Sequence, residues 1–98
     1  MAAALISYYT EVSDDFRFLS RSDYQIDWQK MVIISRNYGY ISSSEIIVDN
    51  SMTRISLWTN ENSYDDWLRD EYVQQYITQR NNYNDIHRVK YYTTLVKL

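Results

Sequence analysis

The sequence predicts an α+β domain in which a four-stranded antiparallel sheet carries two helices on one face. The chain of 98 residues has the length of one domain. Its apolar pattern changes from strand-like to helix-like spacing and back, once in residues 1–50 and again in residues 51–98. Each half therefore has the order strand, helix, strand. A short hairpin joins the halves, and the helical crossovers place both helices on the same side of the sheet.

Composition narrows the classes of protein before any single residue is considered. The formal net charge of −3 disfavours a nucleic-acid-binding protein, because such proteins usually carry a basic surface. The sequence has no cysteine, which excludes disulfides and thiolate metal sites, and the cytosol is the expected compartment. No run of 18 apolar residues occurs, so we expect no membrane span. The eleven tyrosines indicate an aromatic site or, for most of them, a compositional bias.

The first strand is predicted over residues 3–12. Apolar residues occupy both of its alternating rows, which indicates a sheet that is covered on both faces. Asp14 and Asp15 in the following connection form a turn signal. Residues 16–19 are too apolar for an idle loop, and they form either a packed connection or a flap that closes over a ligand.

The first helix is predicted over residues 24–38, with Ser22 and Asp23 as its N-terminal signal. Apolar side chains recur at helical spacing through this segment. The apolar run at residues 31–34 would also fit a strand, but the length of the segment and its flanks favour a helix. Gly39, the only glycine, follows the periodic segment at the position where a left-handed C-terminal cap favours a residue without Cβ.

A hairpin is predicted from strands over residues 40–49 and 52–59. In the second of these strands Arg54 and Trp58 share one face of the sheet, and Ile55 lies on the other.

The strongest helix signal covers residues 64–80. Ser63 is the expected N-cap, and Asp66 three residues later approximates a capping box. The polar cluster at residues 81–85 is expected to end this helix. The last strand is predicted over residues 88–96, again with apolar residues in both rows.

The second face of the sheet needs a cover that the helices cannot provide. A second copy of the same sheet is the simplest cover, since a soluble monomer seldom exposes so large an apolar patch. We therefore expect a homodimer whose sheets pack face to face. Arg54 is expected to pair across this dimer with Glu11 or Glu45, and an anion-binding role for Arg54 is the alternative.

The element order and three local features resemble the dimeric α/β-barrel superfamily, which includes the antibiotic-biosynthesis-monooxygenase-like group. These features are Gly39 before the second strand, Trp58 at the end of the third, and a polar turn before a helix that begins near Tyr64. The resemblance implies a ferredoxin-like βαββαβ sandwich, sheets that pair into a dimeric barrel, and a pocket between helices and sheet. Members oxygenate polycyclic phenols without a cofactor, degrade haem or isomerise substrates. The haem-degrading members are matched at Trp58 only.

The candidates for lining such a pocket are Trp58, Trp67, Tyr72 and Tyr76, although aromatic residues at these spacings are more often core. His87, the only histidine, and Trp58 are the weak candidates for catalysis. The imidazole of His87 could act as a general base beside a pocket, because its unperturbed pKa suits proton transfer near neutral pH. The simpler interpretation is that His87 is a surface or turn residue before the last strand. A single histidine without cysteine makes a poor metal site, so we predict no metal and no cofactor.

Three functions remain open from the sequence. The first is a small homodimer that binds an apolar or aromatic small molecule. The second is a cofactor-independent monooxygenase-like enzyme acting on an aromatic substrate. The third is a structural or interaction module with a filled core. An enclosed cavity with polar groups converging on it would favour binding or catalysis.

Overall fold

The computed structural model describes residues 2–10 and 17–98 of the chain. In chain order the elements are β1 (Ala3–Thr10), the 3-10 turn η1 (Arg21–Asp23), α1 (Trp28–Asn37), β2 (Tyr40–Val48), β3 (Ser51–Trp58), α2 (Ser63–Leu68), α3 (Glu71–Ile86) and β4 (Lys90–Lys97). Residues 11–16, which include the expected end of the first strand and the acidic turn, lie outside the described residues.

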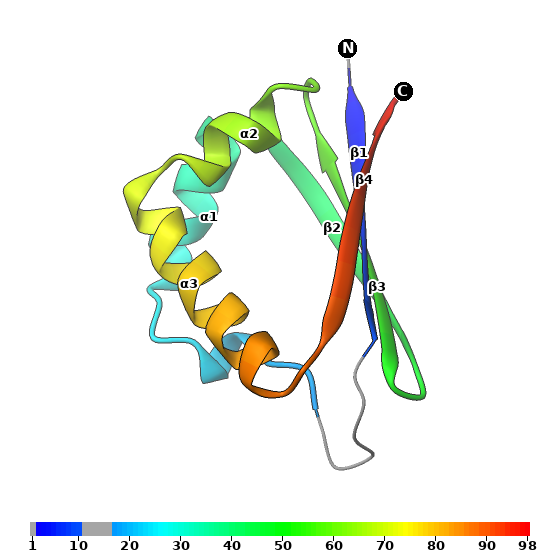
Figure 1. Cartoon of the computed structure of the whole chain (residues 1–98). Coiled ribbons are helices and arrows are strands. Elements are labelled where there is room, and N and C mark those ends of the chain that lie inside the picture. The colour runs from blue at the N-terminus through cyan, green and yellow to red at the C-terminus, as the bar shows by residue number, and fades with distance from the viewer. Residues whose placement is uncertain (1, 11–16) are drawn as a thin grey trace.

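The strands form one antiparallel sheet in the order β2-β3-β1-β4. β1 lies inside the sheet between β3 and β4, and its first residue, Ala3, pairs with Trp58 of β3 on one side and with Lys97 of β4 on the other. The helices lie together on one face of the sheet, and the opposite face carries no helix (Figure 1). The fold is therefore the predicted ferredoxin-like α+β sandwich, with three α-helices in the described residues in place of the two expected.

The first helix begins later than predicted. α1 starts at Trp28, and the carboxylate of Asp27 caps it by accepting from the backbone N–H groups two and three residues on. Ser22 and Asp23 instead belong to the η1 turn, where Asp23 accepts from the backbone N–H of Ser20 at 2.7 Å. The prediction was wrong because two capping signals precede the periodic segment, and spacing alone does not rank them.

The second predicted helix is divided into α2 and α3. The break comes at Asp70, whose carboxylate accepts from the backbone N–H groups of Tyr72 at 2.8 Å and Val73 at 3.2 Å. Asp70 is therefore the N-cap that starts α3. The same carboxylate accepts from the Tyr38 hydroxyl at 3.0 Å, so the contact with α1 and the start of α3 are fixed by one side chain.

Both predicted ends of that helix were wrong. Ser63 is the first residue of α2 rather than its cap, and its hydroxyl lies 3.2 Å from that of Thr59. Residues 81–85 continue α3 instead of ending it. A tertiary contact supports this polar end, because the Tyr83 hydroxyl donates to the Arg17 carbonyl at 2.8 Å. A local bond follows it, in which the backbone N–H of Val89 donates to the Asn84 carbonyl at 2.8 Å.

Gly39 ends α1 as predicted. Its φ of +101° is costly for a residue with a side chain. A Cβ at this position would collide with the Thr59 hydroxyl and lie 2.7 Å from the Ser63 hydroxyl. The Gly39 carbonyl also accepts from the backbone N–H of Thr59 at 2.8 Å. This glycine therefore lets the end of α1 approach the end of β3 closely.

The two faces of the sheet differ in what covers them. Arg54 and Trp58 share one face and Ile55 lies on the other, as predicted, and the face with Arg54 and Trp58 is the one that meets the helices. We call the side without helices the open face. It carries apolar side chains from every strand of the sheet: Ala4, Ile6, Tyr8, Ile46, Val48, Ile55, Leu57, Tyr92 and Val96.

The buried apolar residues fall into two clusters. The larger lies in the helix layer and consists of Met31, Val73, Tyr76 and Ile77. The smaller consists of Tyr9, Met52 and Val89, with Phe18 from the connection after β1 packed on it. No helix in the described part of the chain is long and apolar enough to cross a membrane. The space between the helix layer and the sheet is where the candidate site lies.

Candidate functional site

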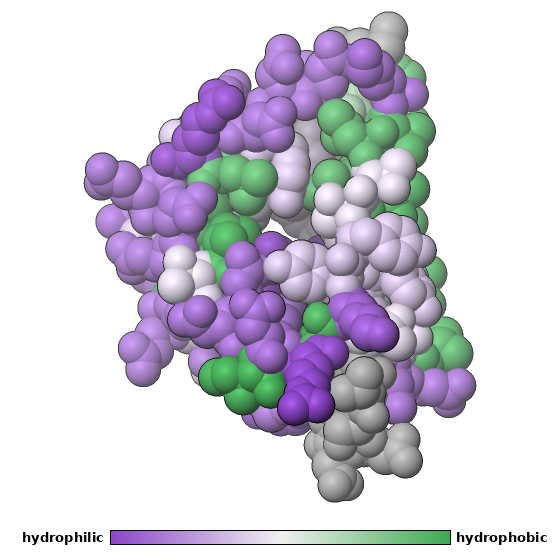
Figure 2. Space-filling view, viewed as in Figure 1, coloured by the Kyte–Doolittle hydropathy of each residue, from purple (hydrophilic) through white to green (hydrophobic). Residues whose placement is uncertain are grey.

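A partly open cavity of about 370 Å³ lies between the helix layer and the sheet. Figure 2 shows the molecule hollowed between these layers. Its floor is the helix-side face of β1, β2 and β3, and its roof is α1, α2 and α3. The connection before α1 also contributes, through Leu19 and Arg21. In the connection expected to be either packed or a flap, Leu19 lines the cavity and Phe18 packs on the smaller cluster, while Phe16 lies outside the described residues.

Trp58 is the centre of the aromatic wall. Its ring lies 5.4 Å from the ring of Tyr40, 5.5 Å from Tyr64 and 5.4 Å from Trp67, measured between centroids. These are the separations at which aromatic pairs attract one another in tilted and edge-to-face geometry. The residues come from β2, β3 and α2, so the wall forms only when helix and sheet meet.

Protein atoms already hold the indole N–H groups of this wall. The indole N–H of Trp58 donates to the Ser56 hydroxyl at 2.9 Å, and that of Trp67 donates to the Ser35 hydroxyl at 3.0 Å. The Ser35 hydroxyl in turn donates to a carbonyl of α1. Each indole is thereby fixed in orientation and presents its ring to the cavity as an apolar surface.

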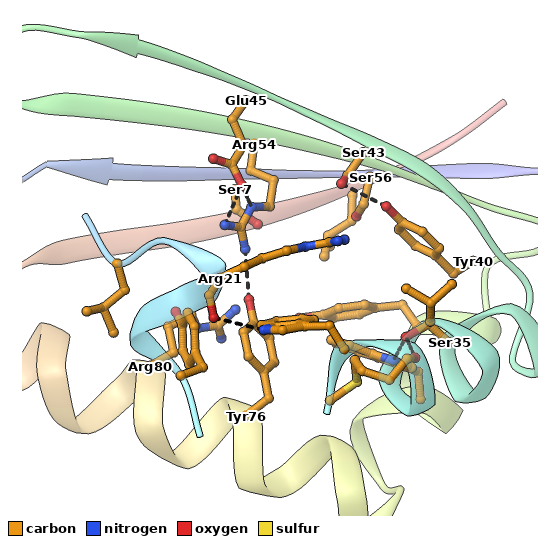
Figure 3. A pocket seen from close by; sticks show the side chains of 18 of the residues that line it. Ser7, Arg21, Ser35, Tyr40, Ser43, Glu45, Arg54, Ser56, Tyr76 and Arg80 are labelled. Atoms are coloured by element: carbon orange, nitrogen blue, oxygen red, sulfur yellow. Dashed lines mark hydrogen bonds and ion pairs between the residues drawn. The ribbon is translucent and has the colours of Figure 1, made fainter. Parts of the chain in front are cut away.

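A polar network crosses the cavity from sheet to helix (Figure 3). Arg54 on β3 donates from Nε at 2.9 Å and from Nη2 at 2.6 Å to Glu45 on β2. Its Nη1 donates to the Tyr76 hydroxyl on α3 at 3.0 Å. The predicted pairing of Arg54 across a dimer is wrong in this respect: Arg54 faces the helices, and its partner Glu45 is in the same chain.

Burial would lower the pKa of Arg54, but Tyr76 and Glu45 raise it above its ordinary value. Burial also raises the pKa of the Tyr24 and Tyr64 hydroxyls, so both stay protonated and able to donate near neutral pH. The polar groups of the cavity are therefore cations and neutral hydroxyls, apart from the Glu45 carboxylate.

Arg80 on α3 also lines the cavity, and one nitrogen of its guanidinium has no hydrogen-bond partner. Its Nε is buried and makes no hydrogen bond, and its guanidinium carbon lies 5.7 Å from the centroid of the Tyr76 ring. Burial would lower the pKa of Arg80, but electrostatic interactions with Tyr9, Tyr76 and Tyr64 raise it above its ordinary value. No carboxylate of the described residues forms an ion pair with it.

The structure brings three of the predicted pocket candidates together. Trp58, Trp67 and Tyr76 line the cavity. Tyr72 does not line it; its hydroxyl accepts from the backbone N–H of Asp27 at 2.8 Å, on the α1 side of α3.

His87 is also outside the cavity. It is the exposed residue that ends α3, and its ring lies 4.4 Å from that of Tyr83. The sequence reasoning missed Arg80, which follows Tyr76 by four residues and therefore lies on the same face of α3. No group of three or more potential metal ligands occurs among the residues that the structure describes.

The fold is similar to that of several solved structures. SnoaB, a cofactor-independent oxygenase from Streptomyces nogalater, aligns with a TM-score of 0.55 and 10% identity over 99% of this chain and 92% of its own. Rv0793 from Mycobacterium tuberculosis aligns with a TM-score of 0.59 and 9% identity over 100% of this chain and 95% of its own. A conserved protein from Methanosarcina mazei Go1 aligns with a TM-score of 0.57 and 11% identity over 99% of this chain and 93% of its own.

No protein-family model matches the chain, and no curated protein matches it significantly. The structural neighbours agree with the resemblance that the sequence suggested, and they include one cofactor-independent oxygenase. At identities of 9–11% the similarity establishes the fold, and the function has to be argued from the site.

Proposed function

We propose that this chain is a homodimeric binding protein whose ligand is an apolar or aromatic small molecule held between the helices and the sheet. The observation that carries the proposal is the aromatic-walled cavity of about 370 Å³, a volume within the usual range of small-molecule sites. A few polar groups converge on this space, as in sites that orient a ligand. The cavity argues against the third alternative, an interaction module with a filled core.

Binding is tested with 2-naphthol, a neutral two-ring compound, by isothermal titration calorimetry. Val32 lines the cavity, whereas the neighbouring Ile33 is 63% exposed on the same helix. Val32→Trp fills the cavity and is expected to weaken binding at least tenfold. Ile33→Trp adds a similar side chain on the outside and is expected to leave the affinity unchanged. No binding by the wild type, or equal affinity of the two variants, would contradict the proposal.

The homodimer is supported by the open face. Its side chains are apolar across the sheet, and Ile46, Val48 and Tyr92 are 60%, 62% and 64% exposed in the single chain. Figure 2 shows this hydrophobic surface along the edge of the molecule opposite the helices. A second copy of the sheet would cover this apolar surface, which is costly to leave in water.

Two neighbouring isoleucines of β2 allow a matched test of the dimer. Ile46 lies on the open face, and Ile47 points to the helix side with nearly the same exposure, 60% against 59%. Ile46→Lys is expected to shift the protein to a monomer in sedimentation velocity at micromolar concentration, because it buries a charge in the interface. Ile47→Lys is expected to remain dimeric. A wild-type monomer under these conditions rules out the dimer while leaving the pocket intact.

A cofactor-independent monooxygenase-like enzyme is the second candidate. Its support is the similarity to SnoaB together with the position of Trp58 in the cavity wall. In that case the wild type consumes oxygen with a tricyclic phenol, and Trp58→Phe loses this turnover. His87→Ala retains it, because His87 lies outside the cavity. Binding of 2-naphthol without oxygen consumption would leave the binding function alone.

A further inference from the structure

We infer that the ligand of this cavity is an anion, namely an aromatic carboxylate whose carboxylate group pairs with Arg80. The inference rests on the proposed binding function and adds to it the charge of the ligand and the direction in which it lies. Three observations carry it: the charge of the lining, the buried Nε of Arg80 that lacks a hydrogen-bond partner, and the arrangement of polar and aromatic groups along the cavity.

The charge of the cavity is opposite in sign to that of the protein. The whole chain carries a formal net charge of −3. The described residues that line the cavity include three arginines, Arg21, Arg54 and Arg80, and one carboxylate, that of Glu45. A concave site lined by charges of one sign focuses its field and attracts ligands of the other sign. The lining therefore favours an anion over a neutral molecule of the same shape.

The three arginines are not equivalent. Glu45 neutralises Arg54, which also donates to Tyr76. Arg21 is exposed, and its guanidinium lies 5.0 Å from the centroid of the Trp28 ring, where solvent and the ring both stabilise it. Arg80 also lies near a ring, that of Tyr76 at 5.7 Å, but its Nε is buried without a hydrogen-bond partner, and no ion pair with a described carboxylate neutralises it.

A buried guanidinium N–H without an acceptor is unfavourable, and a ligand carboxylate would supply the missing acceptor for the Nε of Arg80. Tyr76 provides a second donor beside Arg80. Its oxygen already accepts from Arg54, so its own hydrogen is available to the ligand.

The two ends of the cavity differ in their side chains, and this difference indicates the chemical nature of the rest of the ligand. Figure 3 places Arg80 and Tyr40 at opposite ends of the cavity. Tyr40 packs against Trp58 with 5.4 Å between ring centroids, and the indole N–H groups at this end are satisfied within the protein. The Arg80 end therefore offers charged donors, Arg21 lies over the Trp28 ring between the two ends, and the Tyr40 end offers ring faces. An aromatic carboxylate matches both ends when its carboxylate lies at Arg80 and its rings lie toward Trp58.

The test compares 2-naphthoate with 2-naphthamide, which have the same ring system and nearly the same shape but differ in charge. Affinities are measured by calorimetry at pH 7 for the wild type, Arg80→Met and Arg80→Lys. The wild type is expected to prefer the acid. Arg80→Met is expected to weaken binding of the acid roughly 10- to 100-fold, the range for loss of a charged hydrogen bond, and to change binding of the amide less than threefold. Arg80→Lys is expected to retain part of the preference.

Arg36→Met is the control for the loss of one positive charge, because Arg36 is exposed on α1 and does not line the cavity. It is expected to bind both compounds as the wild type does. Equal wild-type affinity for acid and amide, or an equal loss of both in Arg80→Met, would overturn the inference and leave the proposed binding function standing. Failure of the wild type to bind either compound or 2-naphthol would overturn both. The acid and amide comparison in the wild type holds even where a variant does not fold.

Discussion

Replacing Gly39 with alanine is expected to lower the free energy of unfolding by about 2–5 kcal/mol. Two costs contribute. The backbone at φ +101° is disfavoured for an L-residue by about 1–2 kcal/mol. The new methyl group would also collide with the Thr59 hydroxyl and lie 2.7 Å from the Ser63 hydroxyl, and such overpacking typically costs about 1–3 kcal/mol.

The assay is urea and thermal denaturation followed by circular dichroism, at one protein concentration because association would shift the midpoint. For a domain of this size each kcal/mol lowers Tm by about 4–8 °C, so the decrease should be roughly 8 °C or more. In a Thr59→Ala background the collision with that hydroxyl is absent, so the cost of Gly39→Ala should be smaller, with the backbone cost of about 1–2 kcal/mol and the close contact with Ser63 remaining.

Asp49 and Arg88 supply matched controls, because they have φ values of 51° and 60° with a side chain present. Replacing either with glycine relieves backbone strain and is expected to change stability by less than about 1 kcal/mol. A change below about 0.5 kcal/mol for Gly39→Ala would refute the reasoning, since α1 and β3 would then separate at the Gly39 to Thr59 contact without cost.

Two further predictions concern the helix layer. Asp70→Ala removes the N-cap of α3 and should cost about 1 kcal/mol in denaturant unfolding. Burial would raise the pKa of Asp70, but hydrogen bonds from Val73, Tyr38 and Tyr72 outweigh it and lower this pKa. The stability from the ionised carboxylate is therefore present above about pH 4 and lost as pH falls through the lower folded pKa, so the advantage of wild type over Asp70→Asn should shrink on acidification. Val73→Ala should lower the free energy of unfolding by about 2–3 kcal/mol, because Val73 is fully buried. Ile33→Ala, at an exposed position, should lower it by less than about 0.5 kcal/mol. Equal losses in the two variants would contradict the assigned core.

The predictions that held depend on local geometry. Strand side chains alternate between faces, so the positions of Trp58 and Arg54 on one side and Ile55 on the other followed from spacing alone. Gly39 was recognisable because few positions other than a left-handed cap require glycine.

The helix boundaries were harder, since Asp23 and Asp27 are both acceptable caps by residue type. The division at Asp70 likewise depends on its contact with Tyr38 from another helix.

The candidate site was predictable in part. Trp58, Trp67 and Tyr76 were identified as pocket candidates from their spacing, and they line the cavity. Arg80 could have been found, because it lies four residues after Tyr76 on the same helix face. Tyr72 also lies four residues from Tyr76, yet it contacts the start of α1 instead of the cavity. Helical spacing gives the face of a residue, and the neighbouring helix decides what that face contacts.

The sequence by itself determined the order of the elements, the two apolar faces of the sheet and the turn at Gly39, because each depends on the steric preferences of a few consecutive residues. Only the tertiary structure decided that the helix layer and the sheet enclose a cavity, that Glu45 neutralises Arg54 and that the buried Nε of Arg80 lacks a hydrogen-bond partner. These features depend on distances between segments far apart in the chain, and those distances are set by the packing of whole helices on the sheet.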